Sequence, residues 1–505
     1  MVNKELVSKI EAATVYDVAI KSALDFAPTL SQRFSNRIYL KREDQQCVYS
    51  FKLRGAYNKI AHLSESERNR GVVAASAGNH AQGVALAARK LGIQATIVMP
   101  CTTPSIKVQA VVSMGANAIL HGDTYDEAYA YSQVLTEKRG LAYVHPYDDE
   151  DVIAGQGTVA LEILDQLTDD INAIFVPIGG GGLIAGMASY VKHYRPDVKM
   201  IGVEPQDAPT MHSALQVGKR VQLDDVGIFA DGVAVRCIGE KTFNIAKHLV
   251  DEVLLVSTDE ICAAIKDLFD ETRALLEPAG ALALAGIKQY ITHEKLKGKL
   301  LVAVNSGANI NFDRLRHVAE RAELGERREC LFAVTIPERP GSFLSFCRLL
   351  GARGVTEFNY RYSGTNEAQV FLGVNVEDAD AEKNQILKKL ETSGYPALDI
   401  SDNEVAILHL RHMVGGRCPA LEDEILFRFE FPERPGALLN FLEMIGQEWN
   451  ISLFHYRNHG AAYGRVLAGI QVPAENRQGF DRFLAELGYR CWEETGNPVY
   501  KLFLG

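Results

Sequence analysis

Residues 175–191 read FVPIGGGGLIAGMASYV, and this stretch decides the fold class. The apolar run before the glycines predicts a buried strand, and the apolar run after them predicts a helix. Because successive strand residues are all apolar, both faces of the strand must be covered, as in a parallel sheet. The stretch therefore predicts a strand–turn–helix unit of an α/β fold.

The same alternation of strand and helix extends over most of the chain from about residue 71 to 306. Strands are expected within residues 72–76, 95–100, 118–122, 173–178, 199–205, 252–257 and 299–306, and helical patterns within residues 80–92, 104–115, 124–140, 183–191 and 258–291. Such alternation is typical of parallel sheets with helices on both faces. We therefore expect an α/β domain over residues 1–325.

A duplication follows this region. IPERPGSFLSF at Ile336–Phe346 is repeated as FPERPGALLNF at Phe431–Phe441. The apolar pattern around each copy predicts the order βαββαβ of ferredoxin-like domains. An internal duplication explains both observations. We expect one repeat over residues 329–401, a second over 424–495, and a linker at MVGGRCPA, residues 413–420.

Composition limits the possible functions. The chain has 505 residues, 47% of them hydrophobic and 23% charged, with a net charge of −11. Nucleic-acid binding normally requires a basic surface, so small molecules or proteins are the expected partners. The N-terminus lacks the apolar core of a signal peptide, and no run is long enough to span a bilayer. The sequence thus predicts a cytoplasmic protein without a membrane segment.

Cysteine and histidine spacing does not predict a metal or disulfide framework. The eight cysteines contain no CxxC pair, and they are interpreted as reduced thiols. His409 and His412 could share a helix face, but a metal site needs more ligands. A half-exposed helix is the simpler interpretation of those two histidines.

One candidate binding loop is SAGNHAQG, which begins at Ser76 directly after a predicted strand. Ligands of open α/β sheets bind beyond the carboxyl ends of strands. At such a junction the first backbone N–H groups of the helix have no partner, so Ser76, Ala77, Gly78 and Asn79 would suit a carboxylate. An ordinary N-cap and turn is the alternative, since Ser and Asn are common there.

The glycine loop itself is a second candidate. Gly179, Gly180, Gly181 and Gly182 let the backbone approach a ligand closely, and the helix that follows offers oriented N–H donors to a phosphate. A flexible linker is the alternative interpretation. Four consecutive glycines match neither GxGxxG nor the P-loop, which disfavours a dinucleotide or nucleoside triphosphate.

The third candidate is VYSFKLRGAYNKI at residues 48–60. Ser50 is expected to cap a helix and to place Lys52 in its first turn, where the helix dipole disfavours a cation. Apolar Phe51 and Leu53 add desolvation, and both effects lower the pKa of the lysine. The resulting neutral amine could form a Schiff base. An ordinary solvated lysine is the alternative.

A Schiff-base lysine, a phosphate loop and a carboxylate loop together describe pyridoxal phosphate acting on an amino acid. Such a site needs a partner for the pyridine nitrogen, and Ser306 in VAVNSGANI stands at the end of a predicted strand. The sequence therefore predicts pyridoxal 5'-phosphate as the cofactor.

The motifs SFKLRGA, SAGNHAQG, GGGGL and NSGAN, in this order, resemble the fold-type II pyridoxal phosphate enzymes. Within that group the whole chain, with its duplicated C-terminal part, is most similar to the biosynthetic threonine deaminase (threonine ammonia-lyase) family. The resemblance implies a cofactor-bonding role for Lys52, ring contacts from Phe51 and Asn79, and a bond from Ser306 to the pyridine nitrogen. It also implies that Gly179 to Leu183 hold the phosphate.

The resemblance further implies regulation. Family membership would make the repeats ACT-like domains that bind isoleucine as inhibitor and valine as antagonist, in a homotetramer. The PERPG turns would then border effector sites, which makes Arg339, Gly341, Arg434 and Gly436 regulatory candidates.

A metal is not expected. The serine racemase branch holds a divalent metal with a glutamate, a backbone carbonyl and an aspartate. Glu204 and Ala208 match two of these ligands, but Thr210 stands in place of the aspartate.

The implied reaction is the α,β-elimination of L-threonine to 2-oxobutanoate and ammonia. Lys52 is the candidate for removing the α-proton, and a neutral Ser306 hydroxyl at the ring nitrogen favours prompt elimination. The alternatives are a serine dehydratase or a β-replacement enzyme such as cysteine or cystathionine synthase, both of which leave the duplicated tail unexplained. A catalytically inactive amino-acid sensor is the alternative outside enzymes, and the intact motifs disfavour it.

Overall fold

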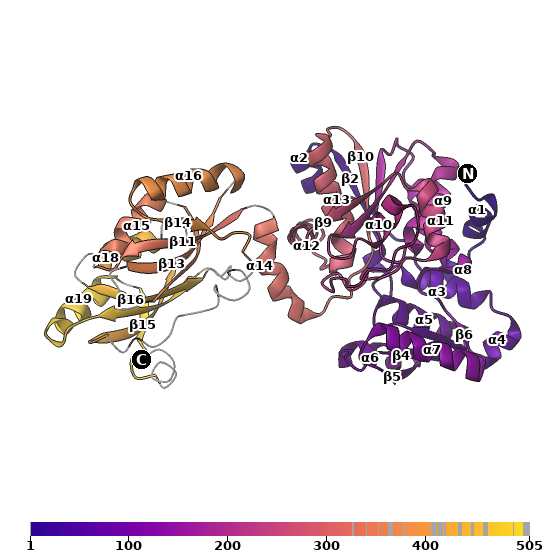
Figure 1. Cartoon of the computed structure of the whole chain (residues 1–505), viewed down its shortest axis with the longest axis horizontal. Coiled ribbons are helices and arrows are strands. Elements are labelled where there is room, and N and C mark those ends of the chain that lie inside the picture. The colour runs from indigo at the N-terminus through magenta and orange to yellow at the C-terminus, as the bar shows by residue number, and fades with distance from the viewer. Residues whose placement is uncertain are drawn as a thin grey trace. The chain divides into compact units, whose positions relative to one another are not determined.

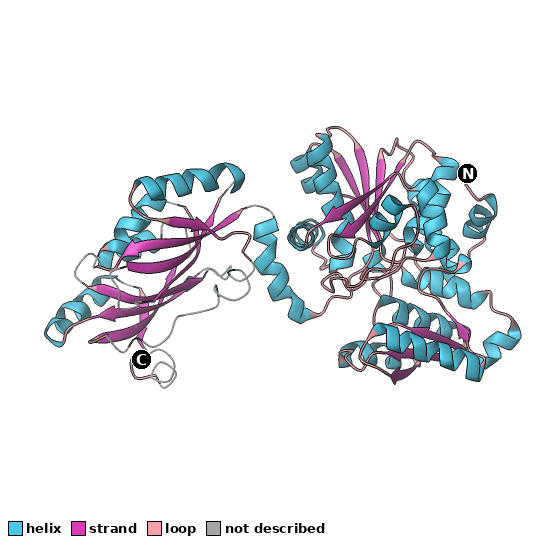
Figure 2. Cartoon of the chain, in the orientation of Figure 1, coloured by secondary structure: helices cyan, strands magenta, loops and turns pink. Residues whose placement is uncertain are grey.

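The computed structural model describes residues 2–325, 328–339, 341–351, 353–361, 367–376, 379–403, 406, 411, 418, 421–432, 437–445, 449–457, 463–487 and 489–497. The chain divides into two compact units, Met1–Gly325 and Glu326–Gly505, here called the first and second units. Figures 1 and 2 show that helices and strands alternate in the first unit, whereas long strands dominate the second.

The first unit contains a six-stranded sheet in which all neighbours except β1 and β2 run parallel. Its strands, in spatial order, are β1 (Leu24–Phe26), β2 (Arg37–Arg42), β10 (Leu300–Asn305), β7 (Ala173–Pro177), β8 (Lys199–Pro205) and β9 (Glu252–Val256). Within β7, Phe175 belongs to one apolar core, and its neighbours Ile174 and Val176 belong to the other. This division explains why the strand is apolar throughout.

Helices cover both faces of this sheet, as Figure 1 shows. The core containing Phe175 is completed by α2 (Pro28–Phe34), α12 (Thr258–Thr272), α13 (Pro278–Glu294) and α14 (Leu315–Gly325). The opposite core is completed by α8 (Glu150–Gln166), α9 (Gly182–Tyr194), α10 (Thr210–Val217) and α11 (Glu240–Leu249), with α1 (Lys4–Glu11) against α8 and α9.

A smaller parallel sheet completes the first unit. Its strands, in spatial order, are β5 (Asn117–Leu120), β4 (Ala95–Met99), β3 (Val72–Ala75) and β6 (Ala142–Tyr143). The helices near it are α3 (Lys52–Ala61), α4 (Glu65–Arg70), α5 (Asn79–Leu91), α6 (Ser105–Ser113) and α7 (Tyr125–Arg139). Val73 faces α7, whereas Val72 and Ala74 face α5. The sheets and their helices confirm the expected α/β class.

Two details differ from the sequence-based expectation. The pattern over residues 258–291 forms two helices, α12 and α13, because Pro278 begins a new helix after Glu277. Ser50 does not cap α3; Phe51 precedes the helix without a side-chain cap, and Ser50 instead forms an isolated bridge with Gly307. Lys52 nevertheless opens the helix.

In the residues that the structure describes, the second unit has one antiparallel sheet and four helices. The strands, in spatial order, are β14 (Ala397–Asp399), β11 (Glu329–Pro337), β13 (Glu367–Asn375), β12 (Val355–Arg361), β16 (Asn450–Arg457), β17 (Tyr463–Gln471), β15 (Glu424–Pro432) and β18 (Arg490–Glu493). The helices are α15 (Ser342–Leu350), α16 (Ala379–Thr392), α18 (Ala437–Ile445) and α19 (Arg477–Leu487). The chain order is βαββαβ twice, and β12 pairs with β16 to join the two copies.

The two copies share a local feature that sequence alone did not reveal. The pairing shifts between Val355 and Glu357 in β12, and Thr356 at this bulge donates a hydrogen bond to Glu329 at 2.5 Å. In the second copy the shift falls at Ser452, which donates to Glu424, also at 2.5 Å. A repeated bulge with the same hydroxyl–carboxylate pair supports an internal duplication.

In the described part of the chain, no helix combines the length and the apolar character needed to cross a membrane.

Candidate active site

The predicted motifs of the first unit meet at the carboxyl edges of its sheets. The Phe51 N–H donates to the Ser306 carbonyl at 3.3 Å, so the Lys52 helix begins beside the loop after β10. The Asn309 side chain in that loop donates to the Asn79 side chain at 2.7 Å, which connects it to the loop after β3. The structure therefore brings Lys52, Ser306 and Asn79 into one region.

Lys52 is partly buried at the start of α3. Its Nζ donates to the Pro146 carbonyl at 2.9 Å and lies 5.4 Å from the centroid of the Phe51 ring. Burial lowers the pKa of Lys52 to about 8, and the Glu277 carboxyl partly opposes this shift. Since burial disfavours the ammonium form, a useful fraction of the amine is neutral near physiological pH.

The segment around Tyr147 connects Lys52 to the glycine loop, and sequence reasoning missed it. A Cβ on Gly180 would lie 2.1 Å from the Tyr147 ring, and one on Gly182 would lie 3.0 Å from the Tyr147 carbonyl. The Tyr147 hydroxyl donates to the Cys237 carbonyl at 3.1 Å. Two of the four glycines are therefore required by the close approach of this tyrosine.

The other two glycines have different roles. Gly181 has φ of 90°, a left-handed conformation that favours glycine, and it directly precedes α9. A Cβ on Gly179 would lie 3.0 Å from the Cα of Val233. The first N–H groups of α9 have no partner within the helix, so this loop can receive a phosphate. Leu183, in the first turn of α9, is buried.

Ser306 directly follows β10, and Ser76 directly follows β3. Ser306 is 3% exposed, and its hydroxyl donates to the Ala279 carbonyl at 3.3 Å. The Ser76 hydroxyl accepts the Gly78 N–H at 3.2 Å, and Ala77 is half-buried between them. The region beside Gly78 is open, since an added Cβ would meet no atom within 4 Å. A substrate carboxylate could approach this turn.

Glu277 is the most important side chain that the sequence did not reveal. It precedes α13, and its carboxylate accepts a hydrogen bond from the Asn79 amide at 2.6 Å. Pro278 was the available signal, because proline at the first helical position marks a helix start with its N-cap just before it. The apolar pattern on both sides concealed this break.

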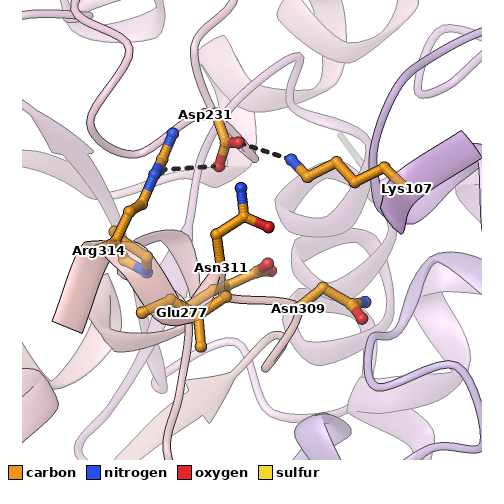
Figure 3. A pocket seen from close by; sticks show the side chains of 8 residues that line it. Lys107, Asp231, Glu277, Asn309, Asn311 and Arg314 are labelled. Atoms are coloured by element: carbon orange, nitrogen blue, oxygen red, sulfur yellow. Dashed lines mark hydrogen bonds and ion pairs between the residues drawn. The ribbon is translucent and has the colours of Figure 1, made fainter. Parts of the chain in front are cut away.

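A pocket opens beside Glu277, as Figure 3 shows. Asp231 forms ion pairs with Lys107 at 3.0 Å and with Arg314 at 3.5 Å. Lys107 lies in α6, which packs beside the smaller sheet. The ion pair between Lys107 and Asp231 therefore connects the parts of the first unit that contain the two sheets. Its lining residues are Lys107, Asp231, Glu277, Pro278, Asn309, Ile310, Asn311 and Arg314.

A buried charge network lies behind Lys52. Arg54 is fully buried and contacts Glu43 at 2.7 Å and Glu162 at 2.6 Å. Lys41, also fully buried, contacts Glu162 at 2.6 Å. Two cations and two carboxylates balance one another here, and they attach the Lys52 helix to α8 and to the 3-10 turn Glu43–Gln45.

Glu204 and Thr210, at the positions compared with the metal ligands of the serine racemase branch, form hydrogen bonds within the protein. Glu204 accepts the backbone N–H groups of Met211 at 2.8 Å and His212 at 2.9 Å, and Thr210 donates to the Val235 carbonyl at 2.5 Å. Among the described residues, no cluster of three or more His, Cys, Asp or Glu side chains could hold a metal. Each of the eight cysteines is free. His409 and His412 lie outside the described residues.

The structure describes two of the four regulatory candidates, Arg339 and Gly341. Gly341 has φ of 81° and precedes α15, and the Arg339 N–H donates to the Pro337 carbonyl at 3.1 Å. Arg434 and Gly436 lie outside the described residues.

Two family models match the chain. The model described as pyridoxal-phosphate dependent enzyme matches residues 18–307. The model described as the C-terminal regulatory domain of threonine dehydratase matches residues 320–410 and again 416–504.

Curated relatives are similar over the full length. The biosynthetic L-threonine dehydratase IlvA of Burkholderia multivorans is 54% identical over 507 residues, which cover 100% of each chain. The Escherichia coli protein of the same name is 50% identical over 500 residues, 99% of this chain and 97% of the relative.

Solved structures resemble the first unit. The processed form of threonine deaminase isoform 2 from Solanum lycopersicum is 51% identical with a TM-score of 0.63, covering 64% of this chain and 88% of that one. Serine racemase from Dictyostelium discoideum is 31% identical with a TM-score of 0.57, covering 61% of this chain and 99% of the racemase.

Proposed function

The chain belongs to the biosynthetic threonine dehydratases, a family of pyridoxal-phosphate-dependent lyases, and we propose that it converts L-threonine to 2-oxobutanoate and ammonia as the first step of isoleucine biosynthesis. The observation that carries the proposal is the Lys52 amine, whose pKa is lowered to about 8 beside the glycine loop and Ser306. A lysine in this state can both bond an aldehyde and accept a proton.

The residues present fit the cofactor. The glycine loop offers unpaired helix N–H groups to a phosphate, Ser306 offers a buried hydroxyl to the pyridine nitrogen, and Lys52 offers its amine to the aldehyde. Phe51 and Asn79 would contact the ring. When bound, pyridoxal phosphate supplies an electron sink for the negative charge that develops at the substrate α-carbon.

The chain's own residues would then perform the remaining tasks. The Ser76–Asn79 turn at the start of α5 binds the substrate carboxylate, with Ala77 presenting its backbone N–H group. The neutral Lys52 amine removes the α-proton. Ser306, a neutral partner rather than a carboxylate, keeps the negative charge short-lived and favours loss of the β-hydroxyl.

Regulation is assigned to the second unit. We propose ACT-like repeats over residues 329–401 and 424–495 that bind isoleucine as inhibitor and valine as antagonist. Arg339 and Gly341 in one PERPG turn and Arg434 and Gly436 in the other would border the effector sites. The match of both repeats to a threonine dehydratase regulatory domain supports this assignment. A homotetramer in the cytoplasm completes the proposal, supported by the family resemblance.

The test measures oxo-acid formation from threonine and from serine, each with and without isoleucine. We expect 2-oxobutanoate from threonine as the main product, and inhibition by isoleucine. Pyruvate from serine as the main product would instead support a serine dehydratase, and a lack of response to isoleucine would contradict the regulatory assignment. Borohydride trapping of the cofactor should label Lys52, and Lys52→Ala should lose both the label and the activity.

A further inference from the structure

Glu277 is a buried carboxyl group at the start of α13. Its residue is 4% exposed, and within the described residues no lysine or arginine forms an ion pair with it. A buried charge normally requires an ion pair or a proton to offset its desolvation. The Glu277 carboxyl group can therefore both bind and release a proton.

The position of Glu277 shows that its carboxylate serves the active site rather than its own helix. Although it occupies the N-cap position of α13, it makes no side-chain cap. The carboxylate instead contacts the Asn79 amide at 2.6 Å and lines the pocket of Figure 3. A Cβ on Gly307, next to Ser306, would lie 2.3 Å from its Oε1.

The charges around Glu277 support the same conclusion. Burial raises its pKa to about 7, a hydrogen bond from Asn79 opposes the shift, and Asp231 adds to it while Lys107 reduces it. Lys52 lies within electrostatic range of this carboxyl, because the Glu277 charge raises the pKa of Lys52. A carboxyl with a pKa near 7 is well suited to general acid–base work at neutral pH.

We propose that Glu277 is a second catalytic residue, which takes a proton from the ammonium group of the incoming amino acid and later gives a proton to the departing β-hydroxyl. This inference rests on the proposed function, since an amino acid with a β-hydroxyl is the substrate that requires both transfers.

The two transfers balance. In the first, the substrate –NH3⁺ and the Glu277 –COO⁻ become –NH2 and –COOH, which makes the amine nucleophilic. In the second, the carbon–oxygen bond of the β-hydroxyl breaks, the oxygen takes the Glu277 proton and leaves as water, and the carboxylate is restored. The α-proton remains with Lys52, so each group carries one proton.

The decisive variant is Glu277→Gln in the full-length holoenzyme. Glutamine can still accept the Asn79 hydrogen bond but cannot exchange a proton, so the amide of Asn79 stays oriented. We expect kcat with threonine to fall about 100-fold, in the range of general acid–base contributions. The acid limb of the wild-type kcat/KM profile, with its midpoint near pH 7, should disappear.

Further variants separate chemistry from structure. Glu277→Asp retains a carboxyl and should keep an acid limb, with a reduced rate because the shorter side chain reaches less far. Glu204→Gln is the matched control, since Glu204 is a second buried carboxyl with a raised pKa, about 8, but contacts the start of α10. Its acid limb should match that of the wild type. Thermal unfolding of all three variants identifies any loss of folding.

A spectroscopic readout does not depend on activity. The infrared spectrum of the resting holoenzyme should contain a protonated-carboxyl band that titrates near pH 7, remains in Glu204→Gln and is missing from Glu277→Gln. An unchanged acid limb in Glu277→Gln, or a band absent from the wild type, would overturn the proton-carrier role, even if kcat falls. If the wild type forms no oxo acid from threonine, the proposed function fails instead, and the infrared titration still decides the protonation of Glu277.

Discussion

At the scale of single residues, the active site depends on what surrounds one amine. In place of water, the Lys52 amine has the Phe51 ring and the Pro146 carbonyl oxygen beside it, and the charge of the Glu277 carboxyl acts on it. Desolvation therefore decides its protonation, and Glu277 only moderates the effect.

The first prediction concerns the titration of this amine. In the full-length protein freed of cofactor, the acylation rate of Lys52 should reach half its maximum near pH 8, whereas exposed lysines do so near about pH 10.4. The proton leaves at lower pH because burial disfavours the ammonium form. Peptide mapping after pulse labelling measures the rate, with Lys52→Arg as the control for the assignment. A profile that coincides with exposed lysines would show that the site is hydrated.

The second prediction tests the glycine loop. Gly180→Ala places a methyl group 2.1 Å from the Tyr147 ring, so the loop or the ring must move. Overpacking of this kind costs about 1–3 kcal/mol, and we expect cofactor affinity to fall at least about fivefold.

Absorbance titration with pyridoxal phosphate measures this change. The double variant Gly180→Ala with Tyr147→Ala should recover much of the affinity, because the ring is removed. Gly496→Ala is the control, since an added Cβ there meets no atom within 4 Å. Equal affinity of Gly180→Ala and the wild type would show that Tyr147 moves aside freely.

The location of the motif residues was predictable, because the loops that follow parallel strands lie at the same edge of a sheet. The motifs therefore indicated the region in which Lys52, Asn79 and Ser306 meet. Glu277 and Tyr147 were not predictable in this way. Glu277 lies in a short break within an apolar pattern. Tyr147 packs closely against Gly180 and Gly182, and the residues near Tyr147 in the sequence do not indicate this long-range contact.

At the scale of elements, the Lys52 helix is held by charge as well as by apolar packing. The strand β2 escaped the sequence-based search because it ends in Lys41 and Arg42, which suggest a solvated segment. Their charges are buried only because Glu162 and Asp44 lie opposite them. Strands with two apolar faces, such as β7 and β10, were predictable, since their pattern requires no partner of a particular charge.

The third prediction concerns this network. Arg54→Met should lower the free energy of unfolding by about 3–5 kcal/mol, because it leaves the buried Glu43 carboxylate without its ion-pair partner and Glu162 with Lys41 alone. Lys21→Met is the control: Lys21 pairs with Asp165 at an exposed position, and its loss should cost at most about 1 kcal/mol. Urea unfolding of the full chain measures both values. Similar values for the two variants would show that the buried charges are not coupled.

The pH dependence of the network has a definite sign. Burial raises the pKa of Glu43, but the charge and hydrogen bond of Arg54 prevail, and the net pKa is lowered. Its contribution to stability is therefore present above the pKa of an unfolded glutamate and is lost as the pH falls through the lower folded value. In Arg54→Met this acid-side dependence should be weaker.

At the scale of the whole molecule, the chain consists of two units with different architectures. The duplication was predictable from the repeated PERPG phrase and its apolar surroundings. The joining of both repeats into one sheet through β12 and β16 was not, because strand pairing between repeats leaves no mark in either repeat alone.

The fourth prediction tests how the repeats depend on each other. Arg361 of the first repeat forms a buried ion pair with Glu424 of the second at 2.5 Å. Arg361→Met should destabilise the second unit by about 3–5 kcal/mol, since Glu424 keeps a buried charge. Differential scanning calorimetry of the full chain would detect this as a lower transition temperature for one unit. Arg477→Met is the control, because its pair with Glu493 is partly exposed to solvent. Equal transition temperatures in Arg361→Met and Arg477→Met would contradict a role of Arg361 in stabilising the second unit.

The strand order of the large sheet has a consequence for synthesis. β10 lies between β2 and β7, although it is the last of these strands to leave the ribosome. Until Leu300–Asn305 emerge, β2 and β7 keep unpaired edges that favour association with other chains. A nascent chain of this enzyme therefore needs protection over most of its translation, and a stop codon before Leu300 should produce aggregates instead of a folded fragment.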